Sequence, residues 1–155
     1  MPEYLQNNPE INLTEAREFL LDLLPKAGEV LKRYFRSGNL LSTSKRGLDL
    51  VTEADGEVER FLLNEISTRF PQSIFLAEET APDDYSAFKG VENLWLIDPL
   101  DGTMNFSRGH PNFAISIALV GKGVTKMGVV YIPLANEIYC AQQDLDVATL
   151  NQEPI

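Results

Sequence analysis

The hydrophobic pattern of this chain changes its period part of the way along, and this change limits the possible folds more than any other feature. Up to Phe70, apolar residues recur at helical spacing in two blocks, 12–34 and 52–70. From Ser73 onward they form short runs separated by turn residues, which is typical of strands. Helices followed by strands predict an α+β domain, with two N-terminal helices packed on a mainly antiparallel sheet.

The first helix is predicted to begin at Asn12, which forms a capping box with Glu15. Residues 1–11 before it are expected to be a flexible arm, so the folded domain is predicted to span 12–155. Pro25 interrupts the helical pattern. Because a proline inside a helix removes a hydrogen bond and costs about 3 kcal/mol, we expect a kink or a break there.

The second helix is predicted to begin at Thr52 and to stop at Pro71. This places Asp55 in its first turn. The segment 38–47 before it, and the polar segment 81–90 after it, are expected to be loops. Strands are predicted at 73–77, 94–97, 113–120, 127–132 and 137–141. The last three are joined by short turns and predict an antiparallel meander.

The charge balance excludes several classes of partner. The chain has 155 residues and a formal net charge of -10, so it is expected to bind neither nucleic acid nor an anionic membrane. A small phosphorylated substrate stays possible, because a bound cation can invert the local field. The N-terminus has no signal-peptide pattern and no apolar run is long enough to span a membrane, so we expect a cytoplasmic protein.

The scarcity of sulfur and imidazole side chains limits the metal chemistry. Cys140 is the single cysteine and His110 the single histidine, so neither a disulfide within the chain nor a zinc site of Cys and His ligands can form. We expect both residues to be structural. Any metal must therefore be held by oxygen ligands.

Carboxylates follow two buried strands at the point where each strand ends. The first strand is followed by Glu78 and Glu79, and the second by Asp98 and Asp101. If the two strands are neighbours, Glu78, Asp98 and Asp101 come together. Converging carboxylates repel one another unless a cation joins them. Oxygen ligands favour Mg²⁺, with Mn²⁺ or Ca²⁺ as possible substitutes.

The residues between and after the two aspartates add an anion site. Pro99 fixes a bend that can turn the Leu100 carbonyl toward the same cation, and Gly102 permits a tight turn. Residues 103–106 can form the first turn of a short helix, whose free N–H groups can bind a phosphate. The Thr103 hydroxyl could hydrogen-bond an attacking water, and Asp55 could accept a hydrogen bond from it. This combination predicts phosphoryl transfer to water.

Each of these residues also has a simpler explanation. Asp55 could only cap its helix, the two glutamates could be solvated, and 98–102 could be an ordinary turn. Lys45 and Arg46 are expected to be solvated charges rather than a phosphate clamp. The simpler explanations do not predict that all of the features occur together.

Four segments resemble the inositol monophosphatase family of lithium-sensitive, magnesium-dependent sugar phosphatases. WLIDPLDGTMNF (95–106) resembles the family signature DPxDGTxNF, and DLVTEAD (49–55) resembles its DLVTxxD segment. AEET (77–80) resembles its GEE segment, and PNFAISIAL (111–119) the strand after the signature. The resemblance implies the layered αβαβα sugar-phosphatase fold, of which this chain corresponds to the N-terminal half.

The resemblance implies a role for each metal ligand. Glu78 would bind a first cation and help to hold the nucleophilic water. Asp98 would bridge two cations, the Leu100 carbonyl would complete the first site, and Asp101 would bind the second cation.

It also implies the residues for substrate and catalysis. Asp101, Gly102 and Thr103 would form the substrate site, with phosphate on the backbone amides of Gly102 and Thr103. Thr103 and Asp55 would be the pair that activates water. Lys45 lies near a family lysine, but its spacing to the DLVT segment does not match.

The departures from the family pattern lead to further expectations. Met104 replaces a usual Thr, and Ala77 replaces Gly. The chain matches only the first half of the family fold, whereas the second half supplies a WDxAAG-like segment whose Asp closes the second cation site. We therefore expect exposed apolar surface, weak binding of one Mg²⁺, and little or no phosphatase activity by this chain alone.

Three functions follow from the resemblance. The first is hydrolysis of inositol monophosphate or a similar polyol phosphate. The second is a related phosphatase reaction on fructose bisphosphate, histidinol phosphate or a 3′-phosphonucleotide. The third is a non-catalytic half-domain that binds a partner or forms a homodimer.

Overall fold

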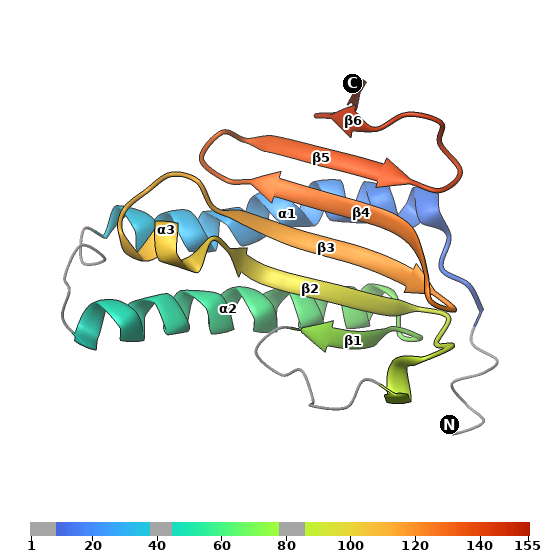
Figure 1. The fold of residues 1–155 in the computed structure, drawn as a ribbon, viewed down its shortest axis with the longest axis horizontal. Helices are drawn as coiled ribbons and strands as arrows, with labels where there is room; N and C mark the ends of the chain where they lie inside the picture. The colour runs from blue at the N-terminus through green and yellow to red at the C-terminus, as the bar shows by residue number, and fades with distance from the viewer. Residues whose placement is uncertain (1–8, 38–44, 78–85) are drawn as a thin grey trace.

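The computed structural model describes residues 9–37, 45–77 and 86–155, and its long helices and its sheet form two layers (Figure 1). The helices are α1 (Leu13–Arg36), α2 (Lys45–Arg69), the 3₁₀ helix η3 (Ser86–Phe88) and the short α3 (Thr103–Ser107). The strands are β1 (Ile74–Ala77), β2 (Leu94–Asp101), β3 (Ala114–Gly121), β4 (Val124–Ile132), β5 (Glu137–Gln142), β6 (Thr149–Leu150) and β7 (Glu153–Pro154).

The strands of the described residues form one seven-stranded sheet in sequence order, β1 to β7. β1 pairs with β2 in parallel, and every later neighbouring pair is antiparallel. This confirms the α+β class, the mainly antiparallel sheet and the predicted meander. β6 and β7 were not predicted, because strands of two residues are too short to show an alternating pattern.

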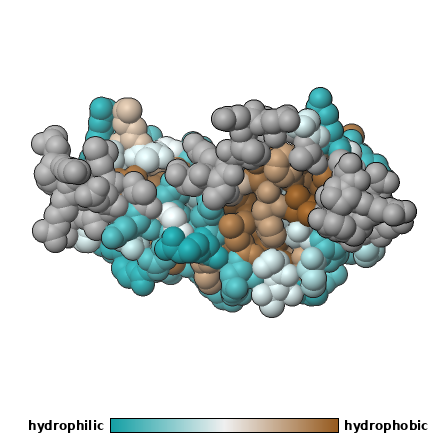
Figure 2. Space-filling view, turned by 90° about the horizontal axis from the view of Figure 1, so that it is seen from below, coloured by the Kyte–Doolittle hydropathy of each residue, from teal (hydrophilic) through white to brown (hydrophobic). Residues whose placement is uncertain are grey.

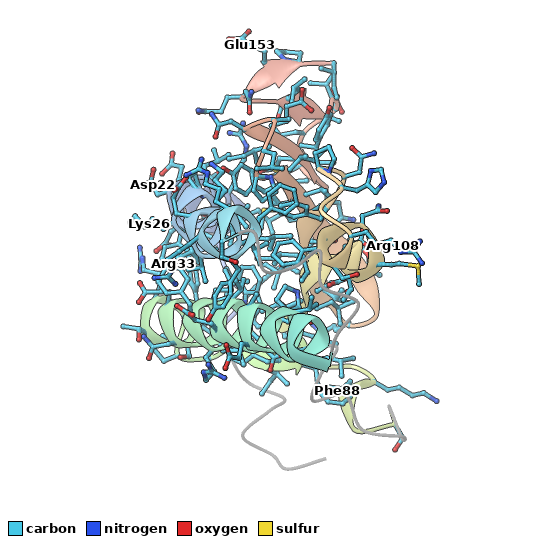
Figure 3. The ribbon with its side chains drawn as sticks, turned by 90° about the vertical axis from the view of Figure 1, so that its left-hand side faces the viewer. Asp22, Lys26, Arg33, Phe88, Arg108 and Glu153 are labelled. Carbon is cyan, nitrogen blue, oxygen red and sulfur yellow. The ribbon has the colours of Figure 1, made fainter. Side chains whose placement is uncertain are left out.

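The main core lies between the sheet and the two long helices, which cover the same face of the sheet (Figures 1 and 3). Along β3 and β4 the residues that reach this core alternate with residues on the opposite face, as a pleated strand requires. Residues of the sheet in this core include Trp95, Ile97, Ile115, Ile117, Met127, Val129 and Tyr131. α1 comes so close to β4 that a Cβ atom on Gly28 would lie 2.4 Å from Cε1 of Tyr131.

The opposite face of the sheet carries a second, smaller hydrophobic cluster. Val91, Leu94 and Val120 are its buried members, and partly buried residues of β1, β2 and η3 pack against them. Neither of the two long helices, α1 and α2, packs on this face (Figures 1 and 3). Seen from below, the surface also shows a group of hydrophobic residues (Figure 2).

Of the predicted kink or break at Pro25, the break is wrong, because α1 runs through this residue without interruption; the kink stays a prediction. Leu23 and Leu24 before the proline, and Ala27 and Gly28 after it, are all buried against the sheet. Burial of this continuous face outweighs the hydrogen bond that the proline removes. The predicted capping box is confirmed at its first bond, in which the Glu15 amide donates to Oδ1 of Asn12 at 2.9 Å.

The predicted start of the second helix at Thr52 is also wrong. α2 begins at Lys45, so 45–47 are helical rather than part of a loop, and 38–44 lie outside the described residues. A glycine inside a helix costs about 1 kcal/mol, so Gly47 by itself does not end one. Asp55 therefore lies well inside α2 and not in its first turn.

The start of the described chain packs on the domain. The Ile11 amide donates to Oδ1 of Asn93 at 3.1 Å, and Nδ2 of Asn93 donates to the Pro9 carbonyl at 2.9 Å. Ile11 is buried, so the predicted arm is held at its last residues, while residues 1–8 lie outside the described ranges. Among the described helices, none is both long enough and apolar enough to cross a membrane.

Candidate cation and phosphate site

The end of β2 contains a β-bulge at the predicted metal ligands. Asp98 pairs with Ser116 and Asp101 pairs with Ala114 on β3. Two residues, Pro99 and Leu100, thus lie between the aspartates, where β3 has one. A proline cannot donate to a sheet, and a bulge is where a strand tolerates one. The strand continues to Asp101, beyond the predicted end at 97, and the bulge interrupts its regular alternation there.

Two hydrogen bonds hold the turn that follows the bulge. The Leu100 amide donates to Oδ1 of Asp98 at 3.1 Å, and Oγ1 of Thr103 donates to the Leu100 carbonyl at 3.0 Å. Leu100 is 1% exposed and belongs to the main core, which anchors this segment. The structure therefore brings three predicted site residues, Asp98, Leu100 and Thr103, into one bonded turn.

Gly102 is required for the geometry of this turn. Its φ of +86° lies in the left-handed region, and it precedes the first residue of α3. A Cβ atom here would lie 2.9 Å from the Asn112 carbonyl oxygen and 3.3 Å from Cα of Phe113. The prediction of a tight turn followed by a short helix is confirmed. The first amides of α3 have no acceptor within their own helix, as at any helix start.

Three aromatic rings fix α3 to the body of the domain. Phe106 is fully buried, and its ring centroid lies 4.8 Å from that of Phe113 in an edge-to-face arrangement. Phe35 of α1 contacts both rings, at 5.7 and 5.2 Å. Such pairs add about 0.5–1.5 kcal/mol each beyond area burial. α3 is therefore held against α1 through the last residue of the sequence signature.

Asp55 is 8% exposed on α2, and α2 contacts both β2 and α3. It falls one helical turn after Val51 and one before Val58, both buried, so it lies on the face toward the sheet. The explanation that Asp55 caps its helix is excluded, because α2 begins far upstream. The pair of Asp55 with Thr103 stays a prediction, since the Thr103 hydroxyl donates to Leu100 here.

Glu78 and Glu79 lie outside the described residues, as does the Lys45 side chain. The basis for expecting Glu78 near the aspartates is nevertheless present: β1 runs parallel to β2, and its last residue, Ala77, pairs with Ile97. Among described residues, no three Asp, Glu, His or Cys side chains form a group that could hold a metal ion. Asp98, Asp101 and the Leu100 carbonyl supply oxygen donors, which suit a hard divalent cation.

Three further residues were singled out in the sequence: Cys140, His110 and Met104. Cys140 is buried, and burial raises the pKa of its thiol, which disfavours the reactive thiolate form. His110 is exposed, and its backbone amide donates to the Asn105 carbonyl at 2.8 Å. Met104 is 64% exposed, so replacement of Thr there disturbs no packing in this structure.

Two polar residues near the site were missed. Glu59 is 6% exposed on α2, one turn after Asp55. Its sequence signal was an acidic residue at a position that helical spacing places on the buried face of the helix. Asn105 hydrogen-bonds the loop that packs on Gly102. Its signal was an amide residue inside the short helix, where Asn is a weak helix former.

The fold is a two-layer α+β domain, and its site is a β-bulge with carboxylate and carbonyl oxygens beside the start of α3. Comparison with known proteins identifies the family. Residues 12–155 match the model of the inositol monophosphatase family. The chain is 38% identical over 126 residues to a fructose-1,6-bisphosphatase/inositol-1-monophosphatase of Thermotoga maritima, covering 81% of this chain and 47% of that protein. It is 36% identical over 130 residues to the inositol-1-monophosphatase of Bacillus subtilis, covering 84% and 48%.

Comparison with solved structures also points to this family. Inositol monophosphatase-II of Staphylococcus aureus matches with a TM-score of 0.77 and 30% identity, over 92% of this chain and 51% of that one. The chain belongs to the inositol monophosphatase family. It spans about half the length of the relatives that it matches.

Proposed function

We propose that this chain carries the cation- and phosphate-binding half of a magnesium-dependent phosphomonoesterase acting on inositol monophosphate or a similar small polyol phosphate. The observation that carries the proposal is the turn 98–103 beside the start of α3. In this turn the Asp98 carboxylate accepts from the Leu100 amide, and the Leu100 carbonyl accepts from the Thr103 hydroxyl. Membership of the family supports it.

The proposed cation ligands are Glu78, Asp98, Asp101 and the Leu100 carbonyl. They are hard oxygen donors of the kind that Mg²⁺ prefers, with Mn²⁺ or Ca²⁺ as possible substitutes. A divalent cation bound there would neutralise phosphate charge and lower the pKa of a bound water. Because the chain has a net charge of -10, phosphate binding without that cation would be opposed by repulsion.

The chain's own residues would bind and orient the reacting groups. The backbone amides of Gly102 and Thr103 would donate to phosphate oxygens. They belong to a tight turn that requires the left-handed conformation of Gly102. The Thr103 hydroxyl would orient the attacking water. Asp55, buried on α2, would accept the Thr103 hydroxyl proton as a hydrogen bond once this hydroxyl turns away from Leu100.

The substrate class stays within the superfamily. The Thermotoga relative is named for both fructose-1,6-bisphosphatase and inositol-1-monophosphatase activity, so both reactions are candidates. Histidinol phosphate and a 3′-phosphonucleotide are further candidate substrates. As the family resemblance implies, we also propose lithium sensitivity and a cytoplasmic location.

Phosphate release by the purified chain, assayed with Mg²⁺ on inositol monophosphate, fructose bisphosphate and a 3′-phosphonucleotide, tests this proposal. We expect little release or none, far below the rate of a full-length relative, and any release should require Mg²⁺ and disappear in Asp98→Asn. Release that is unaffected by chelation or by Asp98→Asn would overturn the proposed site. A rate equal to that of a full-length relative would overturn the claim that the chain carries only half of the machinery.

The face of the sheet opposite α1 and α2 favours a second candidate, a half-domain that associates with a partner or with itself. Val124 and Val130 on β4 are 49% and 37% exposed, and Val130 lies on the face opposite the helices. Gel filtration with light scattering separates the candidates: a stable homodimer without phosphate release supports the second, and a monomer with Mg²⁺-dependent release supports the first.

A further inference from the structure

Asn105 of α3 makes hydrogen bonds that hold the loop between α3 and β3. Its Nδ2 donates to the Asn112 carbonyl at 2.8 Å. Its own carbonyl accepts from the His110 amide at 2.8 Å and from the Arg108 amide at 3.1 Å. One residue thus binds the loop near both of its ends. Arg108, at the start of this loop, is exposed beside α3 (Figure 3).

The carbonyl that Asn105 holds is the one that packs on Gly102. The Asn112 oxygen lies 2.9 Å from the position that a Gly102 Cβ would take. The pairing of β2 with β3 ends at Asp101 and Ala114. Beyond that pair, the contacts between the two segments include the Asn105 hydrogen bonds, this close approach and the packing of Phe113 on Phe106.

We infer that Asn105 is a positioning residue for the phosphate seat, and this inference rests on the proposed function. By fixing the Asn112 carbonyl against Gly102, its side chain keeps the Gly102 and Thr103 amides in the direction that phosphate requires. Within the described residues, the Asn105 side-chain amide donates to the Asn112 carbonyl and not to Asp98, Leu100 or Asp101. Its effect passes through the loop backbone.

The surroundings of Asn105 indicate that replacing it should change the turn at Gly102 and Thr103 without detaching α3 from the core. The residue is exposed, whereas the attachment of α3 to the core comes from the buried Phe106 and its ring contacts. The hydrophobic attachment survives removal of the amide side chain. Orientation of the turn does not, because the side-chain bond to the Asn112 carbonyl comes from Asn105 in the part of the chain that the structure describes.

The first test uses the ligand-free chain. Asn105→Ala removes the amide, and Asn105→Asp keeps its shape but cannot donate. Asn112→Ala is the matched control, since it leaves the backbone carbonyl in place. Backbone order parameters from ¹⁵N relaxation should fall at Gly102 and Thr103 from about 0.85 to below about 0.6 in both Asn105 variants, with wild-type values in the control. Unchanged order parameters in the Asn105 variants would overturn the inference.

The second test is binding. With saturating Mg²⁺, inorganic phosphate is titrated while the amide shifts of Gly102 and Thr103 are followed. We expect the phosphate Kd to rise roughly fivefold to tenfold in both Asn105 variants, which corresponds to the loss of about one hydrogen bond. The Mg²⁺ Kd should change less than about twofold. A general loss of structure would weaken both. An unchanged phosphate Kd in the variants overturns the inference.

The two proposals fail differently. If the wild-type chain shows no Mg²⁺-dependent phosphate shift, the proposed function is overturned. The positioning of the turn by Asn105 is then still decided by the order parameters.

Discussion

The Thr103 hydroxyl donates to the Leu100 carbonyl oxygen at 3.0 Å, so a predicted catalytic group and a predicted metal ligand are bonded to each other. A carbonyl oxygen has two lone pairs and can accept this bond while binding a cation. A hydroxyl has one proton, so Thr103 cannot donate to Leu100 and Asp55 together. The proposed Thr103–Asp55 pair therefore requires rotation of the hydroxyl.

Removal of this hydroxyl should destabilise the turn. Thr103→Val keeps the side-chain shape but leaves the Leu100 carbonyl without this donor, and we expect a loss of about 1 kcal/mol in the free energy of unfolding. Thr103→Ser should recover most of it. Urea denaturation measures both variants. Equal stability of the Val and Ser variants would show that the bond contributes nothing.

Gly102→Ala should be more destabilising than a left-handed backbone alone explains. The conformation costs about 1–2 kcal/mol for a residue with a side chain, and the contact with the Asn112 oxygen at 2.9 Å adds overpacking of about 1–3 kcal/mol. Gly123→Ala is the matched control, since Gly123 has a φ of +81° and nothing within 4 Å of its Cβ position. Equal losses in the two variants would contradict the close approach of the loop to Gly102.

Gly28→Ala and Gly56→Ala should have opposite signs, although both glycines lie in helices. At Gly56 the nearest atom is the flexible end of Arg60, at 3.2 Å, so alanine should stabilise by about 0.5–1 kcal/mol. At Gly28 a methyl group would meet the buried Tyr131 ring at 2.4 Å, and overpacking should cost about 1–3 kcal/mol. Thermal melting of the two variants measures both. Stabilisation by Gly28→Ala would contradict the close packing of α1 on β4.

The link between α1 and α2 should weaken in acid. The Tyr34 hydroxyl, which donates to the Glu57 carboxylate at 2.8 Å, lowers the pKa of this carboxyl below its usual range, and the Arg33 guanidinium lowers this pKa further. A lowered carboxyl pKa contributes stability above its unfolded value, and this is lost as the pH falls through the folded pKa. The Tm difference between wild type and Tyr34→Phe should thus be present near neutral pH and shrink below about pH 4.5. A difference that stays constant in acid would contradict the link. The Glu57 side chain is 38% exposed, so the effect should be small.

The sequence predicted the elements whose pattern repeats. Strands near 94–97 and 113–120 were found because apolar residues filled them, and the short helix at Thr103 because Gly102 and the aspartates marked its start. Pro25 misled the prediction, since local propensity did not reveal how much of α1 is buried. The start of α2 was missed because Gly47 resembled a loop residue.

The site was predictable in its identities and less so in its geometry. Asp98, Leu100, Gly102 and Thr103 could be selected from residue types alone. The bulge at Pro99 depends on the register of β2 against β3, which no local pattern encodes. The contact of the Asn112 carbonyl with Gly102 depends on a loop conformation, so the position of Asn105 in the site became visible only in the structure.

The most direct test of the account is a Mg²⁺ titration of the ¹⁵N-labelled chain, followed by inorganic phosphate. We predict saturable shifts of the amides of 98–103 with weak, millimolar affinity, and a further shift of Gly102 and Thr103 when phosphate is added. Asp101→Asn should weaken the Mg²⁺ response, and Asp146→Asn, an exposed acid outside the site, should not. Saturable shifts centred elsewhere, or none at 98–103, would contradict the cation and phosphate site.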